Sequence, residues 1–294
     1  LSFSSDELAT TTNANLAVNA SADPDIFYSV DGSDNLTVCG SGSCADANIY
    51  VGPGNAYVPA TSTTVVVEAH DFVNDGTIEL DANTLNISGS WENNATSSTD
   101  TSTINLTAST SIETITSIED PLDFHNLTLG SGLGTATFTI STSLDLSGSL
   151  TVASGTLDRD GFDINLAGSL LTGSGGVWSG TGTTTFDGGP GVTWTDNNPT
   201  VQNIGNVIID GASAVVTATT DVSAYDVIIE TGNTLAGGSG TIYVGGDWRN
   251  SGVFNAGSGS VEIVVDDRTY PPIVPGSADW YSDTAFDNRI PIVI

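Results

Sequence analysis

A seven-residue motif recurs three times at nearly constant distance along this chain. IYVGGDW (residues 242–248) has near-copies in LNISGSW (85–91) and INLAGSL (164–170), so the spacings between the copies are 164 − 85 = 79 and 242 − 164 = 78. Each copy reads as a short strand, a glycine kink and a large apolar residue. Repetition at a fixed period is the signature of a repeat architecture, and it constrains the fold more than any other feature of the sequence.

The segments around the motif repeat as well. LTLGSGLGTATFTISTSLDLSGSLTVASGTL (127–157) aligns with VIIDGASAVVTATTDVSAYDVIIETGNTL (207–235), and TSTTVVVEAHDFVNDGTIEL (61–80) resembles a shorter version of the same segment. These matches divide the chain into an N-terminal non-repeat β region and three units of about 80 residues each. The last unit is expected to end in an exposed strand. The expected boundaries are 1–57, 58–126, 127–206 and 207–294.

Local patterning predicts an all-β fold. Short apolar runs are separated by Gly, Ser, Asn or Asp, and TATFTI and SVEIVV alternate with the period of half-buried strands. No segment has a sustained helical spacing of apolar residues. We expect a repetitive β-solenoid-like array, since the units have no linkers between them and only 7% of residues are aromatic. Tandem β-sandwich modules, each closing its own core, are the alternative.

One stretch resembles a known class of protein. Between Phe124 and Gly188, the pattern FHNLTL … LTVASGTLD … GFDINLAGS … GVWSGTGTTTFDG resembles the β-strand repeats of large bacterial and archaeal surface proteins, including filamentous-haemagglutinin-like adhesins and appendage repeats. The resemblance covers the chain from about Thr61 onward and is one of style and period. It implies an exported surface or appendage protein, and it transfers no catalytic residue to this chain.

The charge balance excludes several classes of partner. The chain has 35 acidic residues against four arginines and no lysine, which gives a net charge of −31. Nucleic acids need a basic footprint, and anionic membrane surfaces repel such a chain. No apolar run is long enough for membrane insertion. Strong acidity is typical of soluble proteins that repel one another in a saline setting, so we expect a secreted, extracellular or cell-surface location.

Two cysteines, Cys39 and Cys44, lie in the sequence CGSGSC. Two thiols are too few ligands for a metal site, and neither histidine is close in sequence. The flexible spacer permits a small disulfide loop, which fits an oxidising, extracytoplasmic compartment. Two free thiols are the alternative.

The sequence does not predict an enzyme. His70 and His125 lie in different units, no serine sits in a G-x-S-x-G elbow, and basic residues that would stabilise an oxyanion are scarce. No cofactor is expected, apart from a possible calcium ion at DRDGFD, where Asp158, Asp160 and Asp163 surround a glycine. An ordinary Asp-Gly turn is the other interpretation of this segment.

Glycans enter the predictions in two ways. Stacking on sugars is left open for Trp178, Trp194 and Trp280, whereas Trp91 and Trp248 share a repeat position with a leucine and are expected in the core. The possible N-glycosylation sequons are six: Asn19, Asn35, Asn86, Asn94, Asn105 and Asn126.

The leading functional prediction is a structural subunit of an extracellular, pilus-like filament, a homopolymer assembled head to tail by strand complementation. The N-terminal region, residues 1–18, is expected to be the receiving surface or an added strap along the partner. A glycan-binding adhesin and a polysaccharide-active β-helix enzyme are the alternatives, and the chain could instead be a fragment whose next repeat covers its last strand. The predicted subunit contact is the aliphatic segment RIPIVI: Arg289, Ile290, Pro291, Ile292, Val293 and Ile294.

Overall fold

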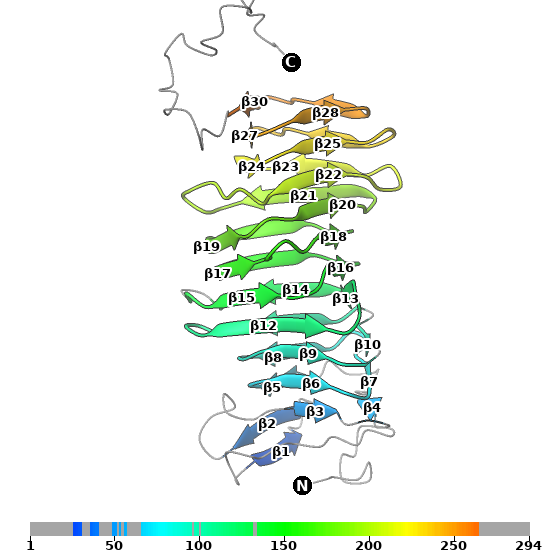
Figure 1. Ribbon diagram of the computed structural model, residues 1–294, viewed down its shortest axis with the longest axis vertical. Helices are drawn as coiled ribbons and strands as arrows, with labels where there is room; N and C mark the ends of the chain where they lie inside the picture. The colour runs from blue at the N-terminus through cyan, green and yellow to red at the C-terminus, as the bar shows by residue number, and fades with distance from the viewer. Residues whose placement is uncertain are drawn as a thin grey trace, which may run out of the picture.

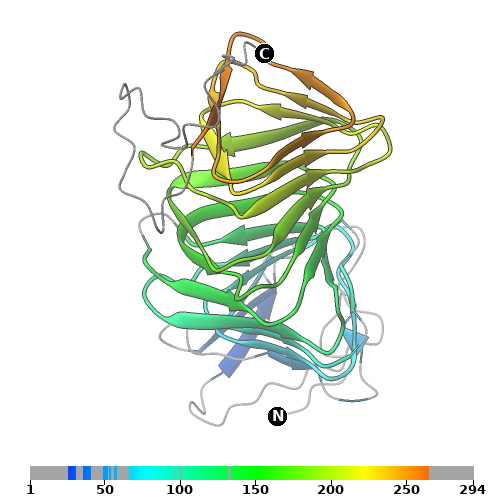
Figure 2. The same cartoon turned by 45° about the horizontal axis from the view of Figure 1, so that its top comes forward.

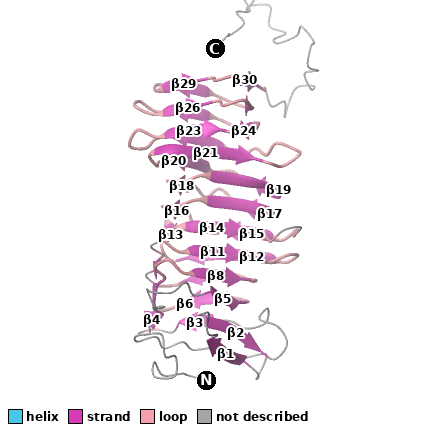
Figure 3. Ribbon diagram, turned by 180° about the vertical axis from the view of Figure 1, so that it is seen from behind, coloured by secondary structure: helices cyan, strands magenta, loops and turns pink. Residues whose placement is uncertain are grey.

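The structure is entirely β in the part of the chain that it describes. The computed structural model describes residues 26–30, 36–40, 49–51, 53, 56–57, 66–95, 97–99, 101–131 and 134–264. Every regular element among these residues is a strand, from β1 to β30 (Figure 3). Within the same residues, no helix is long and apolar enough to cross a membrane.

The strands form a β-solenoid of about nine turns. Successive turns stack along the long axis from the N-terminal end to the C-terminal end, and the turns enclose a central core (Figures 1 and 2). Every pair of strands is parallel except β1 (Ile26–Val30) and β2 (Leu36–Gly40), which are antiparallel. The predicted solenoid is therefore confirmed, and tandem sandwiches are excluded because each strand pairs with strands of the turns below and above it.

Each turn contributes strands to three faces. The first face contains β3 (Ile49–Val51), β6 (Phe72–Asn74), β9 (Trp91–Asn93), β12 (Ile112–Ser117), β15 (Thr137–Ile140), the second halves of β17 (Leu150–Asp158) and β19 (Leu170–Ser179), β24 (Val222–Ala224), β27 (Thr241–Val244) and β30 (Ser260–Ile263). The second face contains β4 (Ala56–Tyr57), β7 (Thr77–Glu79), β10 (Ser97–Ser98), β13 (Leu122–Phe124), β16 (Leu144–Leu146), β18 (Ile164–Leu166), β20 (Thr183–Phe186), β22 (Asn206–Ile209), β25 (Val227–Ile229) and β28 (Trp248–Asn250). The third face contains β5 (Val66–Ala69), β8 (Thr84–Ile87), β11 (Thr103–Leu106), β14 (Asn126–Leu129), the first halves of β17 and β19, β21 (Pro190–Asp196), β23 (Val215–Ala218), β26 (Thr234–Ala236) and β29 (Val253–Asn255).

Alternation along each strand produces the core. Most strands bury every second residue, which points into the solenoid, while the intervening Thr, Ser, Asn and Asp face outward. Because neighbouring turns are in register, buried residues form columns along the axis. One such column on the first face consists of Ile49, Phe72, Trp91, Ile115 and Ile140. The rings of Phe72 and Trp91 are stacked, with centroids 4.6 Å apart.

The three copies of the sequence motif lie on three different faces. The first copy contains β8 of the third face, the second β18 of the second face and the third β27 of the first face. Residue Leu150 is the in-register partner of Leu85 three turns further on, and the chain passes on to the next faces before it reaches Ile164. The motif therefore marks a corner, where the chain passes from one face to the next. The three copies lie at the corners that follow the third, the second and the first face, respectively.

The turn is consequently the structural repeat. The sequence-based boundaries at 126/127 and 206/207 fall inside β14 and β22, and the sheets continue across both positions. Each of the long units suggested by the motif spacing therefore corresponds to several stacked turns rather than to a closed domain.

The corner geometry explains the glycine that all three motif copies share. A Cβ atom at Gly89, Gly168 or Gly246 would lie 2.2 Å from an oxygen of the turn below, closer than any side chain tolerates. The following residue donates its backbone N–H to a side-chain oxygen of that turn, as Ser90 does to Oδ1 of Asp71 at 2.9 Å and Asp247 to Oδ1 of Asp226 at 2.6 Å. The short polar side chains thus satisfy backbone groups where the strand ladder is interrupted.

A buried polar ladder lies inside the corner between the first and second faces. Nδ2 of Asn74 donates to Oδ1 of Asn93 at 2.7 Å, and both side chains are fully buried. Nδ2 of Asn93 in turn donates to Oε2 of Glu119 at 2.9 Å, and Ser97 donates to the same carboxylate oxygen. Asn74 and Asn93 are shielded from water, so their amides depend on neighbouring side chains for these hydrogen bonds.

We predict that Asn93→Ala destabilises the solenoid by about 1–3 kcal/mol, because it leaves the fully buried amide of Asn74 without its acceptor and removes one of the two side chains that donate to Oε2 of Glu119. The matched control is Asn105→Ala, which removes an outward-facing amide that donates to Oδ1 of Asn86 at 2.8 Å. The control is expected to cost less than about 1 kcal/mol. Urea unfolding followed by circular dichroism measures both; equal losses would contradict the assigned role of the buried ladder.

Candidate functional site

At the C-terminal end, no further described strand covers the core of the last described turn. Its inward side chains are those of β28, β29 and β30, and Trp248, Phe254, Val261 and Ile263 pack against the core while only partly buried. One turn below, the in-register positions have no exposed surface. These buried counterparts are Val227, Leu235, Ile242 and Val244.

Three strand edges are free at the same end. β28, β29 and β30 each stand last in the order of their sheet and pair with one neighbour only, among the residues that the structure describes. A terminal strand presents a row of N–H and C=O groups that can pair with another chain. The open end therefore combines partly buried apolar side chains with unpaired backbone groups on all three faces (Figure 1).

The N-terminal end differs from the C-terminal one. Although β3 belongs to the first turn, Ile49 is 1% exposed and Val51 is 0% exposed. The antiparallel pair of β1 and β2 lies at this end, and β2 is in contact with β5 (Figure 1). The two ends of the solenoid are thus chemically distinct, as head-to-tail association requires.

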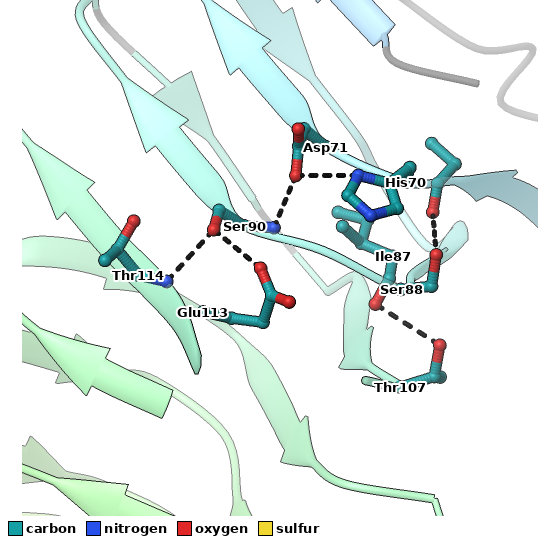
Figure 4. Close-up of polar contacts among 9 residues, drawn as sticks. His70, Asp71, Ile87, Ser88, Ser90, Thr107, Glu113 and Thr114 are labelled. Atoms are coloured by element: carbon teal, nitrogen blue, oxygen red, sulfur yellow. Dashed lines mark hydrogen bonds and ion pairs between the residues drawn. The ribbon is translucent and has the colours of Figure 1, made fainter. Parts of the chain in front are cut away.

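Neither histidine belongs to a recognisable catalytic arrangement. Nδ1 of His70 lies 3.1 Å from Oδ1 of Asp71, but the neighbouring hydroxyl of Ser90 donates to Oε2 of Glu113 at 2.8 Å and accepts the N–H of Thr114 (Figure 4). The contacts of Ser90 and Asp71 join successive turns at one corner. They serve the same purpose as the corner hydrogen bonds elsewhere in the solenoid.

His125 contacts a hydroxyl, with Nδ1 2.9 Å from Oγ of Ser147. A serine nucleophile would also need an acid that orients the imidazole. No carboxylate forms an ion pair with His125 within the described part of the chain. The histidine and the serine belong to successive turns, so this contact also connects neighbouring turns.

The three aspartates of the calcium candidate are not brought together. Oδ1 of Asp158 accepts the N–H of Asp160, and Oδ1 of Asp163 accepts the N–H of Thr183 at 2.7 Å. Across the described residues, no group of three or more His, Cys, Asp or Glu side chains is arranged to hold a metal ion. The geometry favours the Asp-Gly turn, in which Asp160 and Gly161 adopt positive φ angles of 45° and 96°.

The sequons differ in their environment. Asn94 is exposed, whereas Asn86 and Asn105 face outward from neighbouring strands and are hydrogen-bonded to each other. The side chain of Asn126 caps a corner, since its Oδ1 accepts the N–H of Ser149 at 2.9 Å. Of these four asparagines only Asn94 is exposed, and its amide donates to Oδ1 of Asp75 at 3.0 Å and to Oε1 of Glu92 at 2.6 Å. Outside the described residues lie Asn19 and Asn35, the subunit-contact segment 289–294, and Cys44; of Cys39 only the backbone, in β2, is described.

The tryptophans provide no exposed sugar platform in the described residues. Trp91 and Trp194 are buried, and Trp178 lies beneath the first face with its Nε1 donating to Oγ1 of Thr172 at 2.9 Å. Trp248 packs edge-on against Phe254 in the open last turn. Trp280 is outside the described residues. The predicted core positions of Trp91 and Trp248 agree with this packing.

Arg159 is the unexpected residue of the core, because sequence reasoning treated it only as one of four cations. It is 1% exposed and follows Ile140 in the buried column of the first face. Its Nη2 donates to the carbonyl oxygens of Gly182 at 2.9 Å and Ile204 at 2.6 Å, and its Nη1 donates to Thr184. The guanidinium lies 5.4 Å from the ring centroid of Trp178.

No carboxylate pairs directly with Arg159 among the described residues. Burial lowers the pKa of Arg159 to about 10, and the charge of Asp163 opposes this shift. The arginine remains a cation at neutral pH. It donates to the carbonyl oxygen of Ile204 and to that of Gly182, which also accepts the backbone N–H of Asn206. A signal for its position exists in the sequence: Arg159 stands two residues after the apolar Leu157, on the inward side of the alternation.

Three carboxyl groups have pKa values above the ordinary range. Burial raises the pKa of Asp123, and the charge of Asp145, its in-register neighbour on the second face, raises it further. Burial also raises the pKa of Asp187, with Asp145 and Asp210 adding repulsion. For Asp196, burial outweighs two backbone hydrogen bonds that lower the pKa. Each of these groups opposes folding when it is ionised.

The chain matches no protein-family model, and no curated protein or solved structure is significantly similar to it. The case for a function therefore depends on the geometry of this molecule.

We predict that Arg159→Met destabilises the protein by about 1–3 kcal/mol, because the carbonyl oxygen of Ile204 loses its hydrogen bond to the guanidinium and that of Gly182 keeps only the N–H of Asn206. Arg249→Met is the control. Arg249 forms an exposed ion pair with Asp247, at 3.0 Å, and its loss is expected to cost less than about 1 kcal/mol. Thermal and urea unfolding measure both variants. An Arg159 variant as stable as the control would show that the carbonyl contacts do not stabilise the core.

The raised carboxyl pKa values predict a stability that increases on acidification. A carboxyl group with a higher pKa in the folded state binds protons more tightly there, so its penalty is present above that pKa and disappears as the pH falls towards the unfolded value of 3.8. The melting temperature should therefore increase between pH 7 and mildly acidic pH, and Asp187→Asn should reduce the slope. A steady decrease in melting temperature over the same interval would disprove the assignment.

Proposed function

We propose that the protein is a structural subunit of an extracellular surface filament that assembles head to tail by strand complementation. The observation that carries the proposal is the open C-terminal turn, with its partly buried apolar side chains and its three free strand edges. A surface of this kind is normally covered by a cap or a partner. The N-terminal end, where Ile49 and Val51 are already buried, presents the different surface that a head-to-tail contact needs.

The sequence beyond the last described turn favours a second copy as the partner. On the third face at this end, Thr234 is in register with Val253, a spacing of 253 − 234 = 19. The same spacing would place a further strand along β29 near position 253 + 19 = 272. The chain has Pro271, Pro272 and Pro275 there, and proline has no N–H to donate to a ladder. Proline-rich sequence of this kind is a poor match for the edge of β29, and this supports another chain as the partner in the proposed joint.

In the proposed joint, the open turn of one subunit faces the N-terminal end of the next. Residues 289–294 provide an aliphatic strand that crosses the joint and pairs with the first-turn strands of the neighbour. Such a contact does not close on itself, so it generates an open fibre rather than a ring of fixed size. Backbone pairing needs no complementary charges, which suits subunits that each carry a net charge of −31.

Phe254→Asp is expected to abolish filaments, because it places a carboxylate among the apolar side chains at the open end. The control is Ile112→Asp, since Ile112 is 77% exposed on the side of the solenoid. Negative-stain electron microscopy of both purified variants should show filaments for the control only, with unchanged β circular dichroism for both. Filaments of normal length from Phe254→Asp would place the joint elsewhere.

Deletion of residues 289–294 should also abolish polymerisation and leave the β circular-dichroism signal intact, because the described core does not include this segment. Sedimentation of the full chain and of the truncated chain at the same concentration distinguishes polymer from monomer. If the truncated chain polymerises normally, strand complementation by this segment is wrong, even where the end-to-end contact itself persists.

A further inference from the structure

The regular stacking of the first face is broken at one place. Between β19 and β24, residues 197–203 replace a strand, and a single bridge between Asn203 and Ser223 remains. Below the break, the N–H of Trp178 has the side-chain oxygen of Gln202 as its acceptor, at 3.4 Å, instead of a backbone carbonyl. We call residues 197–203 the lateral loop. It projects from the side of the solenoid beside β21 (Figure 1).

The lateral loop is tied to the core by hydrogen bonds of buried and half-buried polar groups. Asp196, which is buried, accepts the N–H of Asn198 at 2.8 Å with Oδ1 and the N–H of Gln202 at 2.6 Å with Oδ2. Asn198 accepts the N–H of Thr200 and donates to the carbonyl oxygen of Gly176. From inside the core, Arg159 fixes the end of the loop through the carbonyl oxygen of Ile204.

Maintaining this arrangement is unfavourable for the fold. Arg159 and Asp196 are both removed from water, they do not form an ion pair with each other, and Nε of Arg159 has no hydrogen-bond partner among the described residues. A plain strand would continue the ladder without either charge. Segments that interrupt a regular fold at a cost in stability are found most often at functional sites. A rigid loop also loses little entropy when a ligand binds.

The exposed chemistry of the lateral loop is polar and uncharged. Asn197, Pro199, Thr200 and Asn203 are exposed, and Val177, in the strand below, is 39% exposed. No acidic or basic side chain occurs from 197 to 203, in a chain with a net charge of −31. Amide and hydroxyl groups bind ligand hydroxyl groups, and small apolar surfaces such as a proline ring contact the C–H faces of sugars.

We infer that the lateral loop is a recognition site for a neutral polysaccharide. A neutral ligand approaches without the repulsion that an acidic glycan or a second copy of this chain would meet. The site lies on the side of the solenoid, away from the ends, so every subunit of a filament would present it. The inference does not depend on filament formation, because the loop is complete within one chain.

Affinity electrophoresis of the full chain in native gels tests the inference. The gels contain a neutral polysaccharide (dextran, galactomannan, xyloglucan or mixed-linkage glucan) or an acidic one (polygalacturonate or alginate). The full chain should be retarded by at least one neutral polymer and by neither acidic polymer. Asn197→Ala combined with Thr200→Ala should weaken that retardation about tenfold, because two exposed hydrogen-bonding groups are lost.

Ser251→Ala is the control, since Ser251 is exposed at a different corner, and it should be retarded as strongly as the unaltered chain. Gln202→Ala, which removes the anchor at Trp178, should also weaken retardation while the β circular dichroism is retained. The inference is overturned if no neutral polymer retards the chain, if the double variant binds normally, or if the acidic polymers bind more strongly. Self-association that is lost in the double variant would instead identify a second copy as the partner.

Discussion

The fold depends on satisfying the backbone at the corners of each turn. Along the faces, parallel strands exchange N–H and C=O groups with the turns below and above, but the ladder stops wherever the chain changes direction. Side-chain oxygens of the preceding turn replace the missing acceptors, as Asp71, Asn126, Asp163 and Asp226 do for the N–H groups above them. Because buried backbone groups without partners are costly, the corners determine where the chain can bend.

The need to satisfy backbone groups at the corners explains why the chain is rich in glycine and in short polar residues. Short polar side chains at corners reach the neighbouring turn only when that turn approaches closely, and the approach requires glycine at positions such as Gly89 and Gly246. Outward-facing Thr, Ser and Asn suit the pleated surface, and their small volumes let successive turns stack in register. The few large residues, such as Phe72 and Trp91, are reserved for the interior, where they stack across turns. Neither the corners nor the outward-facing strand positions of this solenoid require lysine or other long helix-forming residues.

The sequence predicts the fold class well but not the unit that repeats. Alternation and short interstrand segments indicate a β-solenoid, yet the motif spacing suggests three long units, whereas the structure repeats with each turn. The turns also vary in length. Leu85 pairs with Ile104, a spacing of 104 − 85 = 19, whereas Leu170 pairs with Trp194, a spacing of 194 − 170 = 24. Because the turns differ in length, the sequence has no single period of one turn. A recognisable motif is kept only at the tightest corners.

The candidate sites were harder to predict, because they depend on which side of a strand each residue faces. In SIETITS, the alternation permits either Ile112 or Glu113 to point inward, and the structure buries Glu113 and exposes Ile112. For Arg159, the alternation indicates the interior while its charge argues for the surface. The acceptors that resolve this conflict come from Gly182 and Ile204, in later turns. Contacts of this kind arise only after the turns have stacked.

In the proposed fibre, the charge of the sides and the apolar character of the C-terminal end both favour association along the axis. The sides of the solenoid carry carboxylates such as Asp123 and Asp145 in register, and two chains placed side by side would bring such rows together. At the open end, by contrast, the groups without full cover are backbone amides and the apolar side chains of Phe254, Val261 and Ile263. In the proposed fibre, burying these groups would gain hydrophobic and hydrogen-bonding free energy over a cross-section of one turn. The same acidity that keeps the sides apart therefore directs the proposed assembly towards single, unbundled fibres.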